Sequence, residues 1–348
     1  MKALTFTGLQ NISYESIPDP EILSPTDAIV KVKQCAICGS DLHVFYGREQ
    51  GIDHHTAMGH EFSGEVVEVG HDVKTLKKGD LVMSPFTTSC GKCFYCVRGL
   101  TCRCVSSQLF GWVEHGRGLQ GGQSDYVRVP MADGTLMKIP EGITTDEALM
   151  MGDILSTGFY CAKQANIQPN DTHVVIGCGP VGLMTVVGAS YYGSDKLFAI
   201  DTIPERLAMA KKFGAITIDA SKENAIKKIK EVTDGRGADA VMEAVGNAGA
   251  GKLAYDLLRP GGIISVVGVC NDQHLSFTPV QAYDKNITYT VGRCPARSMM
   301  KELTPFVQDK KVDFTSIITH RMKLSEGVSG YDIFANKKDH CLKVVLEP

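Results

Sequence analysis

The sequence has no apolar stretch of the length that a membrane-spanning helix needs. Such a helix takes about 20 consecutive apolar residues, whereas apolar runs here, such as 263–269, are far shorter. The N-terminal segment MKALTFTGLQ has no long apolar run after its lysine, so it does not have the pattern of a secretory signal peptide. We therefore expect no membrane partner and a cytoplasmic location.

The sequence also lacks a dense block of charge of either sign. Lys and Arg number 36, Asp and Glu number 39, and the net charge is −3. Because the basic residues are scattered, the electrostatic footprint of a nucleic-acid-binding protein is missing. The hydrophobic content of 43% and charged content of 22% are ordinary for a folded, soluble chain. The length of 348 residues allows roughly two domains.

Cysteine, by contrast, is abundant, with twelve residues. Because cytosolic thiols stay reduced, cysteines at metal-ligand spacing indicate a metal site before a disulfide. Such spacing occurs in the pattern C-x2-C-x2-C-x7-C, formed by Cys90, Cys93, Cys96 and Cys104. Four thiolates on one short loop close a tetrahedral shell, which is typical of a structural zinc site. Cys102 lies in the same loop and leaves open which cysteine is the fourth ligand.

The two halves of the chain differ in pattern. Short β-like runs at 28–33, 65–69, 81–84 and 126–130, separated by turn residues, predict an irregular and mostly β first domain. Later, apolar strands at 174–176, 197–200, 240–243 and 263–267 alternate with helices at 181–192, 205–213 and 249–258. This alternation predicts an α/β fold with a doubly wound parallel sheet. The chain then ends in a strand-like segment, 341–346.

A glycine-rich segment follows the first of these later strands. Gly177, Gly179 and Gly182 form GCGPVG between the strand THVVI and an apolar helix, and Asp201 ends the next strand. In a dinucleotide-binding fingerprint, such glycines bring the backbone close to the pyrophosphate at the helix N-terminus, and the acidic residue accepts hydrogen bonds from the ribose. A 2′-phosphate would meet like charge there, which favours NAD over NADP. The alternative for Asp201 is a solvated cap of the next turn.

A second set of candidate ligands is dispersed along the chain. Sulfur, nitrogen and oxygen donors are offered by Cys38, His60, Glu61 and Asp153. Three protein ligands and an open fourth position are typical of a catalytic zinc site. Taken singly, each residue has a structural alternative: Cys38 as buried packing, His60 as a core histidine and Asp153 as a helix cap.

Three motifs, in order, carry a resemblance to a known family. The segment GHEFSGEVVEVG at 59–70 matches the zinc alcohol dehydrogenase signature G-H-E-x2-G-x5-G, with CAICGSD before it and GCGPVG after it. The chain thus resembles a zinc-containing medium-chain alcohol dehydrogenase over its whole length. Asp153 and the stretches GDILSTGFYCAK and GRCPARS are most similar to the formaldehyde-dehydrogenase-like and bacterial secondary-alcohol dehydrogenase branch.

The resemblance implies roles for particular residues. It implies that Cys38, His60 and Asp153 bind the catalytic zinc, with Glu61 beside it as an occasional ligand. Ser40 would take the alcohol proton and His43 would pass it outward; the alternatives are a turn residue and a surface histidine. Besides the three glycines and Asp201, the implied cofactor-binding residues are Pro180, Val181, Arg206, Val245, Val269, Arg293 and Lys343. Arg293 and Arg297 would hold a phosphate or carboxylate, or pair with acidic residues at the domain join.

The implied fold is a β-rich, GroES-like catalytic domain formed by residues 1–155 and 295–348, with a Rossmann NAD-binding domain at 156–294 inserted between them. Two zinc ions per chain and NAD are the implied cofactors. The implied reaction transfers hydride between a small primary or secondary alcohol and NAD, giving an aldehyde or ketone. The resemblance also favours a homodimer or a homotetramer.

Other functions stay open at this point. The enzyme alternatives are a formaldehyde dehydrogenase, acting on free or glutathione-linked substrate, and a polyol dehydrogenase. A more distant alternative is a non-catalytic redox sensor that binds NAD and zinc. That alternative requires a broken catalytic shell, whereas Cys38, Ser40, His60 and Asp153 are all present.

Overall fold

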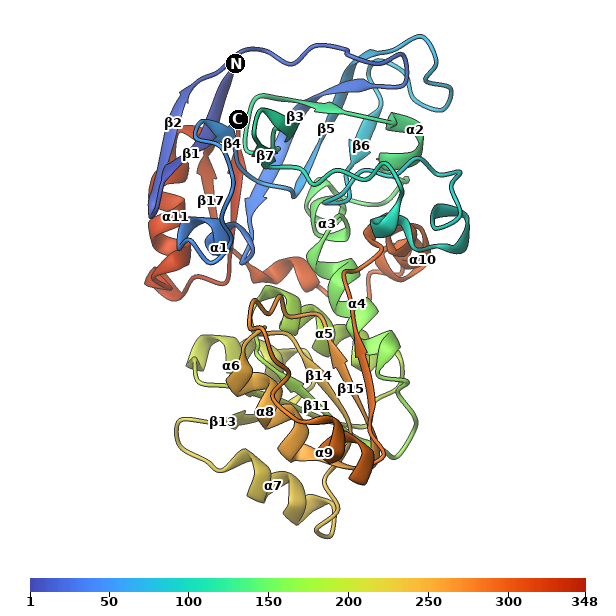
Figure 1. Cartoon of the computed structure of the whole chain (residues 1–348), viewed down its shortest axis with the longest axis vertical. Helices are drawn as coiled ribbons and strands as arrows, with labels where there is room; N and C mark the ends of the chain where they lie inside the picture. The colour runs from blue at the N-terminus through green and yellow to red at the C-terminus, as the bar shows by residue number, and fades with distance from the viewer. The chain divides into compact units, whose positions relative to one another are not determined.

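The computed structural model describes the whole chain, from Met1 to Pro348. The chain divides into two compact units, one formed by Met1–Ser156 together with Pro295–Pro348 and the other by Thr157–Cys294. The first unit therefore contains both ends of the chain, as the blue and red segments of Figure 1 show. None of the helices combines the length and the apolar character needed to cross a bilayer.

The first unit is built on a seven-stranded mixed sheet with the order β10-β6-β5-β3-β18-β17, in which β9 also pairs with β3. These strands are β3 (Ala28–Ile37), β5 (Phe62–Val69), β6 (Leu81–Met83), β9 (Tyr126–Val129), β10 (Met137–Lys138), β17 (Ile318–Lys323) and β18 (Lys343–Glu347). A second sheet has the order β2-β1-β4, with β1 (Lys2–Gly8), β2 (Asn11–Ser16) and β4 (Thr56–Ala57), and β7 (Trp112–Glu114) pairs with β8 (Arg117–Leu119).

The C-terminal strand enters the middle of this sheet. β18 runs antiparallel to β3, with Val344 opposite Ile37 and Leu346 opposite Cys35. Because β3 also pairs with β5, the last strand of the chain lies one strand away from β5. The final segment is therefore part of the sheet that carries the GHE motif.

Short helices connect the strands of the first unit. They are α1 (Asp41–Phe45), α2 (Ala132–Thr135), α3 (Thr145–Met151), α10 (Ala296–Gln308) and α11 (Gly327–Ala335), with 3-10 helices at Cys96–Arg98, Thr101–Arg103, Phe314–Ile317, Leu324–Glu326 and Lys338–His340. α3 begins at a capping box in which Thr144 and Glu147 satisfy each other's backbone N–H groups. α4 (Ile154–Gln164) runs from the first unit into the second.

The second unit is a six-stranded parallel sheet with the order β13-β12-β11-β14-β15-β16. Its strands are β11 (Thr172–Ile176), β12 (Lys196–Asp201), β13 (Ile216–Asp219), β14 (Ala238–Glu243), β15 (Leu258–Val266) and β16 (Thr288–Val291). Its helices are α5 (Pro180–Tyr191), α6 (Pro204–Lys212), α7 (Ala225–Val232), α8 (Ala248–Leu257) and α9 (Pro279–Asp284). Every residue of β11 and β14 is buried, as expected for parallel strands covered on both faces.

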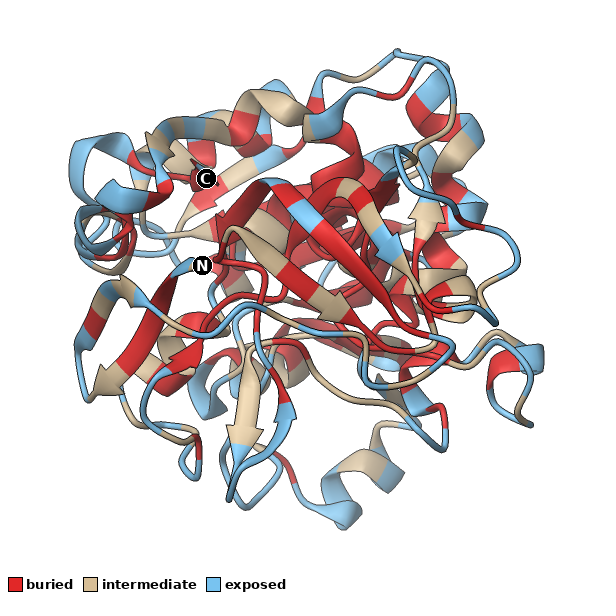
Figure 2. Ribbon diagram, turned by 90° about the horizontal axis from the view of Figure 1, so that it is seen from above, coloured by how far each residue is buried: buried red, intermediate tan, exposed pale blue.

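The doubly wound parallel sheet predicted from the sequence is confirmed. The three predicted helices correspond to α5, α6 and α8, each displaced by a single residue. β13 and α7 were not predicted, because β13 is a short edge strand with an incompletely buried pattern. Each unit has its own apolar core, and buried residues, red in Figure 2, follow the strands while pale blue exposed residues occupy loops and outer helix faces.

The third glycine of GCGPVG is required by close packing. A Cβ at Gly182 would lie 1.8 Å from the carbonyl oxygen of Gly177, so helix α5 can approach the preceding turn only without a side chain there. We expect Gly182→Ala to destabilise the protein by about 1–3 kcal/mol. At Gly292, by contrast, a Cβ would meet no atom closer than 3.8 Å. Thermal unfolding of Gly292→Ala should stay within about 0.5 kcal/mol of the parent, and equal effects of the two substitutions would contradict this account.

Candidate metal and cofactor sites

The four-cysteine loop gathers its sulfur atoms into one group. The sulfur atoms of Cys90, Cys93, Cys96 and Cys104 all lie within 4.8 Å of one another. Cys96 opens one 3-10 helix and Cys104 follows the next, so two tight turns direct both side chains inward. Cys102 is buried nearby in sequence but does not belong to the group. The structure thereby identifies Cys104 as the fourth member.

Backbone N–H groups of the loop point at these sulfur atoms. The N–H of Cys90 donates to Cys104 Sγ at 3.2 Å, and that of Cys93 donates to Cys90 Sγ at 3.3 Å. Hydrogen bonds from the backbone of Cys96 and Val105 lower the pKa of Cys93 to about 6. Such donors stabilise thiolates, the form that binds zinc. Four sulfur ligands leave no open position, so the arrangement fits a structural zinc ion.

The dispersed set also comes together in the first unit. One donor atom each from Cys38, His60, Glu61 and Asp153 falls within 4.8 Å of the others, and all four residues are buried. Cys38 follows β3, His60 and Glu61 precede β5, and Asp153 lies between α3 and α4. Asp153 Oδ2 is 3.5 Å from Cys38 Sγ and 3.3 Å from His60 Nε2. Residues far apart in sequence thus form one compact donor set.

The electrostatics of this set fit a cation. Burial, together with the charges of Glu61 and Asp153, raises the pKa of the Cys38 thiol to about 11. Burial also raises the pKa of Glu61, although Lys343 opposes that shift. Glu61 Oε1 is buried and has no hydrogen-bond partner. Three buried acidic groups and an imidazole are stabilised by a divalent ion, and mixed S, N and O donors are typical of catalytic zinc.

Asp41 completes the surroundings of His60 and was missed in the sequence. Its Oδ1 is 3.3 Å from His60 Nδ1, which leaves His60 Nε2 facing Asp153. Burial would lower the pKa of His60, but the charges of Asp41 and Cys38 raise it well above its ordinary value. Carboxylates that orient a metal-binding histidine in this way recur in zinc sites. The sequence signal was the aspartate that ends CAICGSD, three residues after Cys38.

Lys343, one of the predicted cofactor residues, forms a buried ion pair in the structure. Its ammonium group pairs with Glu61 Oε2 and donates to the carbonyl oxygen of Ile37 at 3.1 Å. Both Lys343 and Glu61 are 1% exposed, so this ion pair is buried. Lys343 therefore neutralises Glu61 at the metal set. The register of β18 beside β3 causes this placement.

Ser40 and His43 lie on the same short segment as Cys38. Ser40 Oγ is 3.2 Å from His60 Nε2, on the side of the imidazole that faces Asp153. His43 belongs to α1, and its Nδ1 is 4.0 Å from Glu49 Oε1. Ser40 is thus adjacent to the donor set, whereas His43 lies farther along the helix.

The predicted cofactor residues of the second unit gather at the carboxyl ends of its central strands. Gly177 has a φ of +85°, and a Cβ there would lie 2.4 Å from a methyl group of Val245. A Cβ at Gly246 would lie 2.3 Å from the carbonyl oxygen of Val269, so these two turns also touch. α5 starts at Gly179 without a side-chain cap and has Pro180 in its first turn. Its N-terminal N–H groups are therefore suited to a phosphate.

Asp201 is held firmly at the end of β12. Its Oδ2 accepts a hydrogen bond from the N–H of Cys178 at 2.7 Å, and Oδ1 accepts from the N–H groups of Thr202 and Ile203. Arg206 Nη1 lies 3.9 Å from Asp201. The carboxylate thus joins the glycine turn to the adjacent strand, in the place of the acidic residue of a dinucleotide fingerprint.

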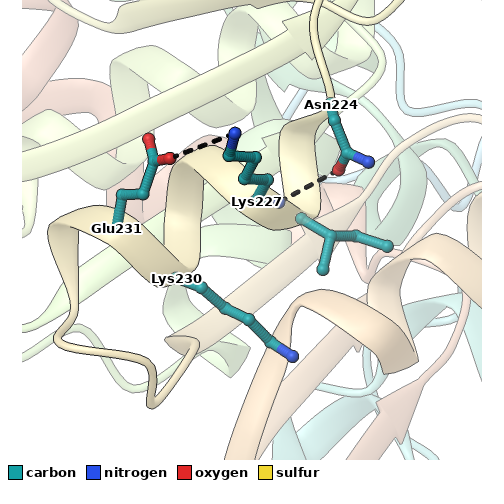
Figure 3. Close-up of a pocket in the computed structure, with 5 residues that line it drawn as sticks. Asn224, Lys227, Lys230 and Glu231 are labelled. Carbon is teal, nitrogen blue, oxygen red and sulfur yellow. Dashed lines mark hydrogen bonds and ion pairs between the residues drawn. The ribbon is translucent and has the colours of Figure 1, made fainter.

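Arg297 and the pocket along helix α7 lie outside the two candidate metal sites and the glycine turn. In the first unit, Arg297 contacts Met137 Sδ at 3.9 Å, and burial lowers its pKa. Figure 3 shows a pocket along α7, where Asn224 caps the helix and Lys227 lies 3.9 Å from Glu231. Its lining residues are Asn224, Ile226, Lys227, Lys230 and Glu231, and none of them is a predicted site residue.

The chain is similar to known proteins in sequence and in fold. The family model "Alcohol dehydrogenase GroES-like domain" matches residues 24–141, and "Zinc-binding dehydrogenase" matches residues 180–309. Zinc-type alcohol dehydrogenase B of Aspergillus flavus is 43% identical over 342 residues, covering 96% of this chain and 78% of that protein. The uncharacterized zinc-type alcohol dehydrogenase-like protein AdhB of Bacillus subtilis is 36% identical, with 100% of both chains covered. The structure of alcohol dehydrogenase TADH from Thermus sp. ATN1 has a TM-score of 0.93 and 36% identity, covering 100% of this chain and 99% of that one.

These similarities confirm the predicted GroES-like and Rossmann-type folds and the enzyme class. Zinc is the metal of this family, and the chain has two groups of side chains that could hold it. Dependence on NAD is typical of the family. This chain belongs to the zinc-containing medium-chain alcohol dehydrogenase family.

Proposed function

We propose that the chain interconverts a small primary or secondary alcohol and its aldehyde or ketone, with NAD as the hydride carrier. The observation that carries the proposal is the buried set of Cys38, His60 and Asp153, whose donor atoms lie within 4.8 Å of one another. Ser40 lies beside it, and the second unit has a glycine turn with an acidic residue. The set fits a metal ion with an open position, which acid–base chemistry at an alcohol requires.

Each residue has a distinct part in this proposal. A zinc ion held by Cys38, His60 and Asp153 would supply a Lewis acid that makes an alcohol hydroxyl more acidic. Ser40, with Oγ 3.2 Å from His60 Nε2, would take the alcohol proton, and His43 would pass it outward. Because Cys38, His60 and Asp153 are buried, they would limit the access of water to the reacting oxygen.

The cofactor residues support NAD in particular. The N-terminus of α5 would face the pyrophosphate, while Asp201 would accept from the adenosine ribose. Pro180, Val181, Arg206, Val245, Val269 and Arg293 remain proposed neighbours of the cofactor. NAD would supply the hydride acceptor, and the side chains fix its position and charge environment.

A substrate panel tests the proposal directly. With NAD present, we expect turnover of small primary or secondary alcohols and lower kcat/KM for formaldehyde, with or without glutathione, and for polyols. The measurement is NADH absorbance with purified, zinc-loaded protein. A higher kcat/KM for a diol would instead support a polyol dehydrogenase, and a higher kcat/KM for glutathione-linked formaldehyde would support a formaldehyde dehydrogenase. The absence of turnover with every substrate would favour a non-catalytic role.

The proposed location and assembly follow from other features. We infer a cytoplasmic location because all twelve cysteines are free thiols, four of which form one group of metal ligands while Cys38 belongs to a second group. We infer a homodimer or homotetramer because β16 is an edge strand that pairs with β15 on one side only, and Val291 at its end is 64% exposed.

The two zinc sites should fail in different ways. Asp153→Asn removes a negative charge from the dispersed set, so activity should fall steeply, with partial return in excess zinc. Cys93→Ser opens the closed loop, so stability or assembly should fall first. Metal analysis should find two zinc ions per parent chain.

The matched control is Asp146→Asn, because Asp146 is an acidic residue of α3 that lies outside both sets. Full turnover by Asp153→Asn after chelation would rule out chemistry through this site.

The cofactor preference depends on Asp201. Asp201→Ser should weaken NAD binding by about tenfold, because a ribose acceptor is lost, and should narrow the preference over NADP. Asp219 is the matched control, since it stands opposite Asp201 at the end of the neighbouring strand β13. Titration of NADH fluorescence should show little change for Asp219→Ser. A parent enzyme that already prefers NADP would contradict the role of Asp201.

A further inference from the structure

A chain of buried polar side chains connects the C-terminal helix α11 to the histidine of the metal site. Tyr331 in α11 donates its hydroxyl hydrogen to Gln123 Oε1 at 2.8 Å. Gln123 Nε2 donates to Asp41 Oδ2 at 3.1 Å. The other oxygen of Asp41 faces His60 Nδ1. All four residues are at most 7% exposed, so water does not substitute for these contacts.

The neighbours of the Gln123 amide fix its orientation. Nε2 also donates to the carbonyl oxygen of Ala36 at 3.1 Å, so this end faces two acceptors. Rotating the amide by half a turn would place Oε1 against both acceptors without a hydrogen between them. In the observed orientation Oε1 receives the hydroxyl hydrogen of Tyr331. Burial raises the pKa of Tyr331 well above its ordinary value, so the hydroxyl keeps that hydrogen.

The two carboxylate oxygens of Asp41 contact different groups. Oδ2 accepts from Gln123 Nε2 and from the N–H of Cys38, at 2.9 Å. Oδ1 is left for His60 Nδ1. With Nδ1 facing a carboxylate, the metal-facing atom of the imidazole is Nε2. Rotation of the Asp41 carboxylate would loosen this selection, and Gln123 is the side chain that opposes such rotation.

The packing of the GHE motif is built around Gln123. Gly59 has a φ of +88°, and a Cβ there would lie 2.4 Å from Gln123 Cγ. Gly59 directly precedes His60, so the backbone that carries the ligand lies against the stem of Gln123. The glutamine is therefore fixed at both ends, by backbone packing and by its hydrogen bonds.

We propose that Gln123 is a positioning residue for the metal site: its hydrogen bond to Asp41 Oδ2 keeps Asp41 Oδ1 on His60 Nδ1, and Tyr331 fixes the orientation of its amide. The inference rests on the zinc site of the proposed function and deepens it. Gln123 and Tyr331 touch no metal, cofactor or substrate in this proposal. They act through Asp41 and His60 on how firmly the ion is held.

Metal retention tests the proposal without any alcohol. Gln123→Met keeps the length of the side chain and removes both polar atoms. In protein loaded with cobalt(II), a chelator should remove the ion from the dispersed set about tenfold faster, and its visible absorption bands should shift. The ion in the four-cysteine loop should be retained as in the parent. Tyr331→Phe should act in the same direction with a smaller factor, and it carries the test if Gln123→Met fails to fold.

Thr5→Val is the matched control, because Thr5 is equally buried and also makes a side-chain hydrogen bond, to Glu15. It should leave cobalt loss unchanged, even where thermal stability falls. A second comparison uses Asp41→Asn, in which Gln123→Met should have no further effect on cobalt loss. Equal cobalt loss in Gln123→Met and Thr5→Val, or an undiminished effect in Asp41→Asn, would overturn the proposal. A parent protein that binds cobalt but oxidises no alcohol would count against the proposed function alone.

Discussion

Burying several acidic side chains beside one another is the constraint on which the first unit depends. Cys38, Glu61 and Asp153 lie with His60 in a space where their donor atoms are within 4.8 Å. Without compensation, such a group protonates or separates, and the pKa of Cys38, raised to about 11, shows that direction. A divalent cation removes the conflict and makes the same residues strong ligands. The surrounding contacts then serve to hold each ligand in one orientation.

The sheet of the first unit supplies those contacts. β3 pairs with β5 so that Cys35 stands opposite Phe62, which places the segment after β3 beside the residues before β5. β18 lies on the other side of β3 and brings Lys343 to Glu61. The C-terminal segment thus supplies a cation for one ligand through Lys343. The same C-terminal segment contains Tyr331 of α11, which donates a hydrogen bond to Gln123. Gln123 in turn bonds to Asp41, the carboxylate that faces His60.

In the second unit, backbone N–H groups rather than charged side chains are suited to binding an anion. Its glycine turn and the uncapped start of α5 expose N–H groups suited to a phosphate, while Asp201 adds one negative charge at the next strand. The same carboxylate accepts a hydrogen bond from the turn, so ribose recognition and turn geometry would share one side chain. Asp201 stands at the very end of β12, where its carboxylate reaches the N–H of Cys178 in the glycine turn.

The sequence by itself determined the features whose parts are close together in the chain. The four-cysteine loop, GCGPVG and the alternation of strands with helices could all be predicted, because short loops and local periodicity bring those residues together in any compact fold. The dispersed ligands needed the resemblance to a known family, since nothing local links Cys38 to Asp153. Only the tertiary structure showed which side chains contact the candidate ligands and their neighbours. Asp41 faces His60, Gln123 donates a hydrogen bond to Asp41, and Lys343 pairs with Glu61. Those pairings span up to 282 residues of sequence, and no local pattern predicts them. The register of β18 beside β3 sets the pairing of Lys343 with Glu61.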